Sequence, residues 1–360
     1  MLRAGLIGLP ASGKTTLFHL LTSTREAART RGKAEANVGI SRVPDERLDR
    51  LTAMFQPQRR VPATVEFADM AAGARADTKA LLDVAAYRNA DALLHVVRAF
   101  AEASVPHPQG ANAPARDARA IEDELILADL DVAERRLERL ERDLKKGSTA
   151  DLLKEQTVLR RCKDALDSGR PLRALGLEGE DARRLRGFQF LSAKPLLIVI
   201  NLDETDVAKA DSAGTAFGLT DLLTNTHAAA IGVCAKIELE IAQLDPADAA
   251  AFLQDLGLAA SGLDRVIRAA YDLLGYISFF TVGEDECRAW SIPRGTPAQE
   301  AAGAIHSDIQ RGFIRAEVVP WDRLLAHGSF AACRDHGELR LEGKEYLVAD
   351  GDVITFRHAT

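Results

Sequence analysis

The chain contains 360 residues, of which 47% are hydrophobic, 28% charged and 5% aromatic. This composition excludes a mainly disordered chain, and a length above about 300 residues predicts more than one domain. The formal net charge of -7 excludes nucleic-acid binding by bulk electrostatics alone, so DNA is not an expected partner. The longest clean apolar run, Leu196–Ile200, is too short to span a membrane. No signal-peptide pattern precedes the first motif, and a cytoplasmic location is expected.

Short apolar runs alternate with helical patterns over residues 1–118 and again over 190–275. This alternation predicts an α/β domain whose mostly parallel sheet is covered by helices on both faces. The runs expected to form its strands are Leu2–Leu9, Gly39–Val43, Thr64–Met70, Ala92–Phe100, Leu196–Asn201 and Ala228–Cys234.

A glycine-rich motif with the spacing G-x-x-x-x-G-K-[ST] spans Gly8–Thr15, between the first expected strand and a helix expected to begin near Lys14. In such a loop the backbone N–H groups surround phosphate, the lysine neutralises its charge and the hydroxyl ligates Mg²⁺. We therefore expect a bound nucleotide rather than a merely structural glycine turn. The expected phosphate-side residues are Gly8, Pro10, Ala11, Ser12, Gly13, Lys14, Thr15 and Thr16.

Two polar stretches follow later strands of the expected sheet. Asp69 stands where a carboxylate holds Mg²⁺ through water, so Thr15 and Asp69 are the expected metal residues. Asn201 and Glu204 follow the apolar expected strand Leu196–Ile200 at the carboxyl edge, where ligands of open α/β sheets bind. We expect them to contact the base, and Lys14 and Asp69 to serve catalysis. The alternative is that both stretches are ordinary strand-end turns.

Residues 119–189 interrupt the sheet pattern with two helical series. From Ile126 to Leu144 apolar residues recur at alternating spacings of four and three, and a second series runs from Leu152 to Leu166. Gly147 is expected to end the first helix and Ser148 to start the second. The pattern predicts an antiparallel coiled-coil arm; an ordinary helix pair packed on the core is the alternative.

Residues 276–360 change to alternating strand-like runs with one helix near Thr296–Ile309, which predicts an α+β module. Its 9 Lys and Arg against 13 Asp and Glu favour a protein contact over autonomous RNA binding. The expected strands are Ile277–Val282, Arg288–Ile292, Phe313–Val319, Leu339–Leu341, Glu345–Leu347 and Val353–Arg357.

The histidines and the four cysteines show no metal-ligand spacing, so Mg²⁺ is the only expected metal. His95 lies inside an apolar strand and is expected to be a core residue rather than a base.

Several motifs occur together along nearly the whole chain: Gly8-Leu9-Pro10, Gly13-Lys14, Val43-Pro44-Asp45, Glu66-Phe67-Ala68-Asp69, His95-Val96-Val97-Arg98, Arg136-Leu137-Glu138-Arg139, Gly312-Phe313-Ile314-Arg315 and Asp350-Gly351-Asp352-Val353. With them the chain resembles the YchF family, the ATP-preferring branch of the Obg-related P-loop GTPases. The resemblance implies a Ras-like P-loop NTPase domain over 1–118 and 190–275, an inserted antiparallel helical hairpin over 119–189, and a TGS, or β-grasp, domain over 276–360.

The resemblance also implies a function. The family's base-reading motif ends in Glu where true GTPases have Asp, and Glu204 matches that pattern. Guanine offers two adjacent donors that suit a short carboxylate, whereas adenine has an acceptor at N1, so ATP is expected over GTP. Leu202 is expected to cover the base, and Ala235 completes the expected nucleotide contacts. The arm and the TGS domain are expected to contact the ribosome, or a translation-associated protein or RNA.

The chain departs from the family at the residues that would support hydrolysis. Ala11-Ser12 replaces an asparagine-valine pair, Lys33 falls where a threonine binds Mg²⁺, and Ala72 replaces a hinge glycine, with Gly73 one step late. Slow hydrolysis of ATP or GTP is therefore expected. The alternatives are a non-hydrolysing, nucleotide-dependent adaptor and a small-molecule kinase, for which no acceptor site or arginine-bearing lid is evident.

Overall fold

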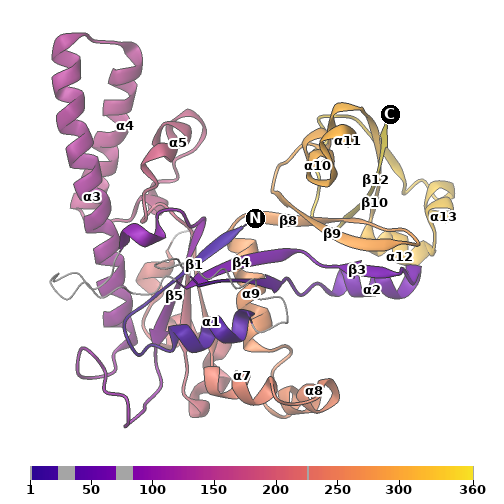
Figure 1. Ribbon diagram of the computed structural model, residues 1–360, viewed down its shortest axis with the longest axis horizontal. Coiled ribbons are helices and arrows are strands. Elements are labelled where there is room, and N and C mark those ends of the chain that lie inside the picture. The colour runs from indigo at the N-terminus through magenta and orange to yellow at the C-terminus, as the bar shows by residue number, and fades with distance from the viewer. Residues whose placement is uncertain (1, 23–36, 70–83, 225–226, 360) are drawn as a thin grey trace. The chain divides into compact units, whose positions relative to one another are not determined.

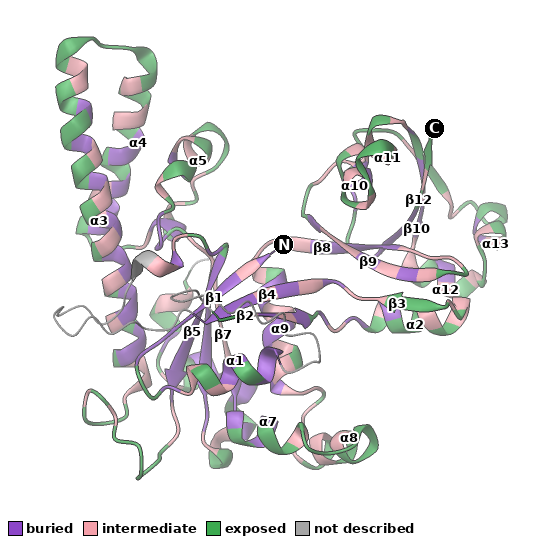
Figure 2. Cartoon of the chain, in the orientation of Figure 1, coloured by how far each residue is buried: buried purple, intermediate pink, exposed green. Residues whose placement is uncertain are grey.

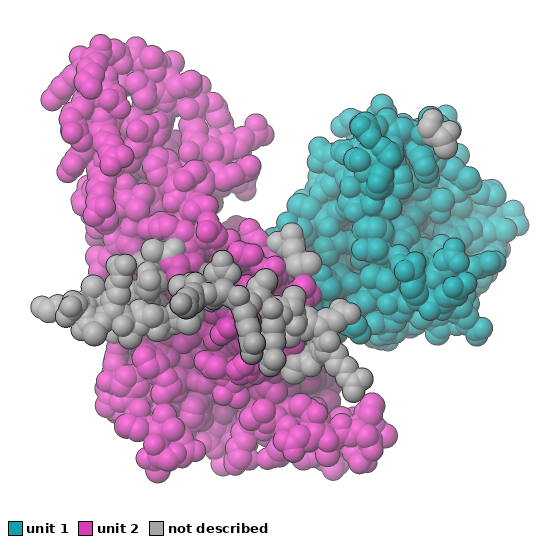
Figure 3. All heavy atoms as spheres, viewed as in Figure 1, with its two compact units in different colours: residues 1, 41–65, 274–360 teal, residues 2–40, 66–273 magenta. Residues whose placement is uncertain are grey.

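The computed structural model describes residues 2–22, 37–69, 84–224 and 227–359. The chain divides into two compact units, which Figures 1 and 3 show. The larger unit comprises residues 2–40 and 66–273, and the smaller unit comprises 41–65 and 274–360. None of the helices in these described ranges is long and apolar enough to cross a membrane.

The larger unit contains a sheet with the strand order β2-β4-β1-β5-β6-β7. Its strands are β1 Arg3–Ile7, β2 Asn37–Arg42, β4 Thr64–Asp69, β5 Ala92–Arg98, β6 Leu196–Asn201 and β7 Ala228–Val233. Strand β1 pairs in parallel with β4 and β5, and β5, β6 and β7 continue in parallel. Strands β5 and β6 are buried along their whole length (Figure 2), which explains why both are continuous apolar runs. The predicted α/β sheet is confirmed.

The helices of the larger unit complete its core. They are α1 Lys14–Thr22, α3 Pro114–Lys146, α4 Ala150–Asp167, α5 Gly179–Leu185, α6 Ala213–Ala216, α7 Ala235–Ile241, α8 Pro246–Asp255 and α9 Gly262–Leu273. Short 3₁₀ turns are η1 Val84–Tyr87, η2 Leu172–Leu175, η3 Arg186–Phe188, η4 Glu204–Ser212 and η5 Thr220–Leu223. One core cluster joins Ile198 and Ile200 of β6 to Leu125 of α3 and Ile237 of α7.

Helices α3 and α4 form the predicted antiparallel hairpin, which projects in Figure 1. Its seam buries Ala133 and Leu140 against Leu159 and Cys162. The first helix ends before Gly147, as expected, but Thr149 rather than Ser148 caps the second. The Thr149 hydroxyl accepts a hydrogen bond from Leu152 N–H, the usual N-cap contact three residues into a helix.

A buried carboxylate attaches the hairpin to the sheet. Asp129 of α3 is fully buried and accepts hydrogen bonds from Leu191 N–H at 2.9 Å and Ser192 N–H at 2.7 Å. Burial raises the pKa of the Asp129 carboxyl, against the opposite effect of these bonds. The chain is therefore held against α3 where it returns toward β6.

The smaller unit contains a sheet with the order β11-β10-β12-β8-β9-β3. Its elements are α2 Glu46–Phe55, β3 Arg59–Val61, β8 Tyr276–Thr281, β9 Glu286–Pro293, α10 Ala298–Ile305, α11 Ser307–Arg311, β10 Phe313–Pro320, α12 Trp321–His327, α13 Phe330–Asp335, β11 Arg340–Glu342 and β12 Asp352–His358. The predicted α+β character is confirmed, with β8 antiparallel to β9 and parallel to β12.

Three details of this unit differ from the sequence prediction. The run Glu345–Leu347 is not a strand, since only an isolated bridge at Leu347 pairs with another segment. The expected helix over 296–309 breaks at His306, whose extended backbone and ring Nδ1 cap α11. Helices α12 and α13 were not predicted from sequence.

The smaller unit also includes residues 41–65, which the sequence-based division placed with the phosphate-loop domain. Strand β3 of this segment pairs in parallel with β9. Arg47 at the start of α2 donates to Asp45 and, from across the unit, to Asp350 at 2.8 Å. Its guanidinium group also lies 5.3 Å from the centre of the Phe280 ring. Arg47 therefore joins the segment to the C-terminal strands by an ion pair and a cation–π contact.

We expect Arg47→Ala to destabilise the smaller unit by about 2 to 4 kcal/mol, because it removes the Arg47 guanidinium from the buried Asp45 carboxylate. Both tryptophans of the chain, Trp290 and Trp321, lie in this unit, so their fluorescence during urea unfolding reports its stability. The control is Arg60→Ala, which removes a more exposed pair with Asp49 and should cost less than about 1 kcal/mol. Equal losses of unfolding free energy in Arg47→Ala and Arg60→Ala would contradict the role given to Arg47.

Candidate nucleotide-binding site

The predicted phosphate loop connects β1 to α1, and two of its glycines are required by geometry. Gly8 and Gly13 have φ angles of 155° and 88°. A Cβ atom on Gly8 would lie 2.5 Å from Val96 O, and one on Gly13 would lie 2.2 Å from Asn201 Nδ2. Side chains at either position would therefore displace the loop from its neighbouring strands.

The middle of the loop is exposed and contains a strained residue. Pro10 and Ala11 are exposed, and Ala11 has a φ of 61°, a left-handed conformation that costs about 1 kcal/mol for a non-glycine residue. Ser12 is buried, and its hydroxyl has no hydrogen-bond partner among the described residues. The backbone therefore turns sharply before α1 begins at Lys14.

The two predicted metal residues lie next to each other. Thr15 Oγ1 is 3.5 Å from Asp69 Oδ2, because β4 runs parallel to β1 with Leu6 opposite Asp69. A hydroxyl and a carboxylate are the oxygen ligands that Mg²⁺ prefers. The Lys14 ammonium lies 3.5 Å from Gly8 O, folded back over the loop. These residues fit the predicted cation and phosphate chemistry.

Asn201 connects the loop to the other side of the site. Its Nδ2 donates to Ser12 O at 3.1 Å, and its Oδ1 accepts from Ala235 N–H at 3.1 Å. The side chain is buried, and one oxygen and one N–H of its amide are used by the protein itself. The sequence assigned Asn201 to a base; the structure adds a positioning role between the turn after β1 and the turn after β7.

A pocket of about 250 Å³ adjoins the phosphate loop and is lined by residues that follow β5, β6 and β7. The lining residues are Gly13, Thr16, Phe100, Ala101, Glu102, Asn201, Leu202, Asp203, Glu204, Cys234, Ala235, Lys236 and Leu239. All the predicted base-side residues, Asn201, Leu202, Glu204 and Ala235, therefore line a single pocket. Leu202 is buried there and contributes an apolar surface.

Two carboxylates at this pocket, those of Glu204 and Asp203, are held by hydrogen bonds. Lys236 Nζ donates to Glu204 Oε2 at 2.6 Å, although both side chains are exposed. Asp203 caps η4 and accepts from Thr205 N–H and Ala101 N–H, which lower the pKa of the Asp203 carboxyl. Asp203 therefore ties the loop after β5 to the loop after β6, and Lys236 restrains the Glu204 carboxylate.

Comparisons with known proteins agree with this architecture. A family model named YchF-GTPase_C, described as a protein of unknown function (DUF933), matches residues 276–359. A ribosome-binding ATPase YchF of Bacillus subtilis (strain 168) is 41% identical over 365 residues, covering 99% of each protein. The protein of the same name from Escherichia coli O157:H7 is 37% identical over 363 residues, covering 98% of each. The chain belongs to the YchF family.

A solved structure supports the same conclusion. The Schizosaccharomyces pombe YchF GTPase superposes with a TM-score of 0.87 at 28% identity, covering 99% of this chain and 97% of that one. The fold class predicted from the sequence, a P-loop NTPase fold followed by a C-terminal domain, is confirmed. The switch positions of this YchF-family chain, Lys33, Ala72 and Gly73, lie outside the described residues.

Sequence reasoning missed several pocket residues, among them Lys236 and Phe100. Lys236 directly follows Ala235 at the carboxyl end of β7, so its place at the strand edge was a usable signal. Phe100 carried the same signal, because it lies two residues after β5 ends at Arg98. Its ring lies 4.6 Å from the buried Arg98 guanidinium, and Arg98 also donates to Phe100 O. The contacts that hold Phe100 at the pocket therefore include local ones, with a residue two positions away in the chain.

His95 lies in β5 opposite Ile7, the residue that precedes the loop. Burial, with the positive charges of Arg173 and Lys14, lowers the pKa of His95 to about 3. The imidazole is therefore neutral in the folded protein at neutral pH, in keeping with the expected core residue.

We expect this burial to make stability depend on pH. Between pH 6.5 and 3 the unfolded chain binds a proton at His95 that the folded chain does not, so stability falls as pH falls through that window. Between pH 6.5 and pH 5, the free energy of unfolding of His95→Gln should fall by about 2 kcal/mol less than that of the unchanged chain. Urea unfolding followed by circular dichroism measures it, with exposed His19→Gln as the control. An unchanged pH profile in His95→Gln would contradict the prediction.

Proposed function

We propose that this YchF-family chain binds ATP with Mg²⁺, hydrolyses it slowly and acts as a ribosome-associated switch. The observation that carries the proposal is one continuous site, in which Asn201 links the loop containing Lys14 to the pocket containing Glu204. Ribosome-binding ATPase is the name printed for relatives that match this chain over almost their whole length.

The phosphate side supports triphosphate binding. Lys14 would neutralise charge on the phosphates, and the backbone N–H groups of residues 12–16 would donate to phosphate oxygens at the start of α1. Thr15 and Asp69 would hold Mg²⁺, which supplies charge neutralisation between the phosphates. The protein's contribution is then positioning and electrostatic stabilisation rather than covalent chemistry.

The base side supports adenine over guanine. Guanine recognition needs a carboxylate free to accept two adjacent N–H groups. The Glu204 carboxylate instead accepts from Lys236 at 2.6 Å, so a guanine would have to compete with this ion pair. Adenine lacks this pair of adjacent N–H donors and so needs no free carboxylate. The side chains of Phe100 and Leu202 line the pocket and suit the apolar faces of the base.

Slow turnover follows from the substitutions at Lys33 and Ala72, which stand where the family has a metal-binding threonine and a hinge glycine. Firm ATP binding without measurable turnover would instead support a non-hydrolysing adaptor. The helical hairpin and the TGS domain over 276–360 are the proposed contacts to the ribosome or to translation-associated protein or RNA. A cytoplasmic location follows from that proposed partner.

The direct test is Lys14→Ala, which should abolish ATP binding in isothermal titration with Mg²⁺ while circular dichroism shows an unchanged fold. The lysine acts by charge, and its ammonium lies over the loop, 3.5 Å from Gly8 O. Lys145→Ala, which removes an exposed lysine of the arm, should bind as the unchanged chain does. Equal ATP affinity in the folded Lys14→Ala protein would refute the phosphate-loop assignment.

Base preference is tested by Glu204→Asp. The shorter carboxylate is expected to leave Lys236 and to accept from guanine, which shifts preference toward GTP by about 1 to 3 kcal/mol. Competition of ATP and GTP for a fluorescent nucleotide measures the shift. Glu240→Asp, on an exposed position of α7 outside the pocket, is the matched control. GTP binding about tenfold tighter than ATP in the unchanged chain would contradict the proposal.

A further inference from the structure

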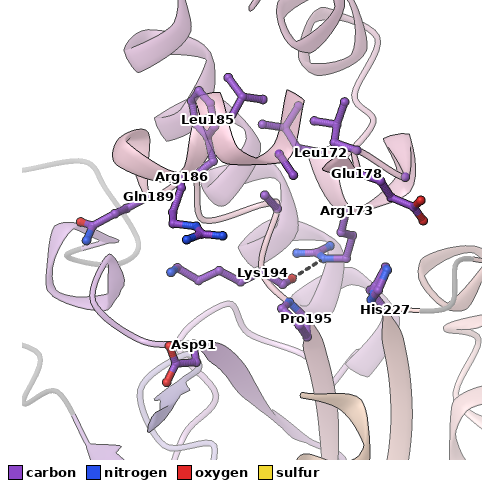
Figure 4. Close-up of a pocket in the computed structure, with 15 residues that line it drawn as sticks. Asp91, Leu172, Arg173, Glu178, Leu185, Arg186, Gln189, Lys194, Pro195 and His227 are labelled. Atoms are coloured by element: carbon purple, nitrogen blue, oxygen red, sulfur yellow. Dashed lines mark hydrogen bonds between the residues drawn. The ribbon is translucent and has the colours of Figure 1, made fainter. Parts of the chain in front are cut away.

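A second pocket lies at the base of the helical hairpin and shares no lining residue with the nucleotide pocket. Its volume is about 400 Å³, within the range of about 300 to 1,000 Å³ typical of small-molecule sites. Figure 4 shows it between the turns around α5 and the segment that leads into β6. Nothing in the proposed nucleotide chemistry uses this pocket.

The walls are largely apolar. Leu172, Leu177, Leu185 and Phe190 line the pocket, and Phe190 stacks on Phe188 with ring centres 5.3 Å apart. Leu172, Leu185 and Phe190 also belong to the core cluster of the hairpin, so these walls are held by packing. Such walls suit the hydrocarbon body of a ligand.

Two guanidinium groups point toward the middle of the pocket from opposite walls in Figure 4, those of Arg173 and Arg186. The Arg173 side chain is 1% exposed, donates to Lys194 O at 2.9 Å and pairs with Glu122. Its Nη2 has no hydrogen-bond partner among the described residues. A buried guanidinium with an unused N–H is unusual, because such groups lose their hydration without replacement.

The charges leave one cation without a counter-ion. Arg173 is balanced by Glu122, and Lys194 lies in the field of Asp91. Glu178 lines the pocket, but its carboxylate points away from the middle in Figure 4. Arg186 is exposed and forms no ion pair within the described parts of the chain.

We propose that this pocket binds a small organic carboxylate with an apolar body, its carboxylate held between Arg186 and Arg173. A single uncompensated cation matches a monoanion better than a multiply charged phosphate. The planar fork of a guanidinium matches the two oxygens of a carboxylate. An anion there would also stabilise the Lys194 ammonium, whose pKa is lowered mainly by burial.

The probe is 4-phenylbutyrate, titrated calorimetrically into the full chain with saturating ADP and Mg²⁺ so that the phosphate loop is filled. Heat from the ADP titration reports the proposed function separately. We expect a Kd below about 1 mM for 4-phenylbutyrate. Acetate, which lacks the body, and 4-phenylbutan-1-ol, which lacks the charge, should each bind at least about tenfold more weakly.

Variants locate the site. Arg186→Glu should weaken 4-phenylbutyrate binding at least about tenfold, because it places a negative charge beside the carboxylate. Arg183→Glu makes the same charge change at an exposed position of α5 outside the pocket and should leave the Kd within about twofold. Both positions are exposed, so neither variant should unfold the chain. Equal binding of the alcohol and the carboxylate, or equal Kd values in the two variants, would overturn the proposal.

Discussion

The side-chain amide of Asn201 holds together the two halves of the candidate nucleotide site. Its Nδ2 reaches Ser12 O in the phosphate loop, and its Oδ1 accepts from Ala235 N–H at the start of α7. Because an amide is planar and rigid, these two bonds fix the distance between the turn after β1 and the turn after β7. The Gly13 backbone must pass directly beside this amide, which leaves no room for a side chain. The distance between the phosphate loop and the adjoining pocket therefore depends on one buried residue.

The same arrangement explains why the site lies at one edge of the sheet. Strands β1, β4, β5, β6 and β7 are parallel neighbours, so the polar turns that follow them come together at their carboxyl ends. Asp69 follows β4 and meets Thr15, while Glu204 follows β6 and meets Lys236. Each pair joins residues that are distant in sequence. Both contacts form because the strands that precede these residues run parallel and end at the same edge of the sheet.

In each unit, buried charged groups hold an inserted or distant segment of the chain against the rest of that unit. Asp129 binds the backbone where the hairpin returns, and Arg47 joins residues 41–65 to the C-terminal strands. Glu238 of α7 accepts from Gly262 N–H at the start of α9. A buried charge is stable only when its hydrogen bonds are satisfied, so each of these contacts specifies one position for its segment. Among the described residues, Nη2 of Arg173 at the hairpin base and Oε2 of Glu238 nonetheless have no hydrogen-bond partner.

The sequence alone determined the features that depend on local pattern. The spacing from Gly8 to Thr15 and the apolar run of β6 were sufficient because a turn and a strand are encoded by neighbouring residues. Tertiary structure decided the rest. The run Glu345–Leu347 has the pattern of a strand but lacks a partner over its length, whereas β3 pairs with a strand more than 200 residues away in the chain. The contact between Lys236 and Glu204 and the pocket at the base of the hairpin likewise form between segments that are distant in sequence. No local periodicity predicts such contacts.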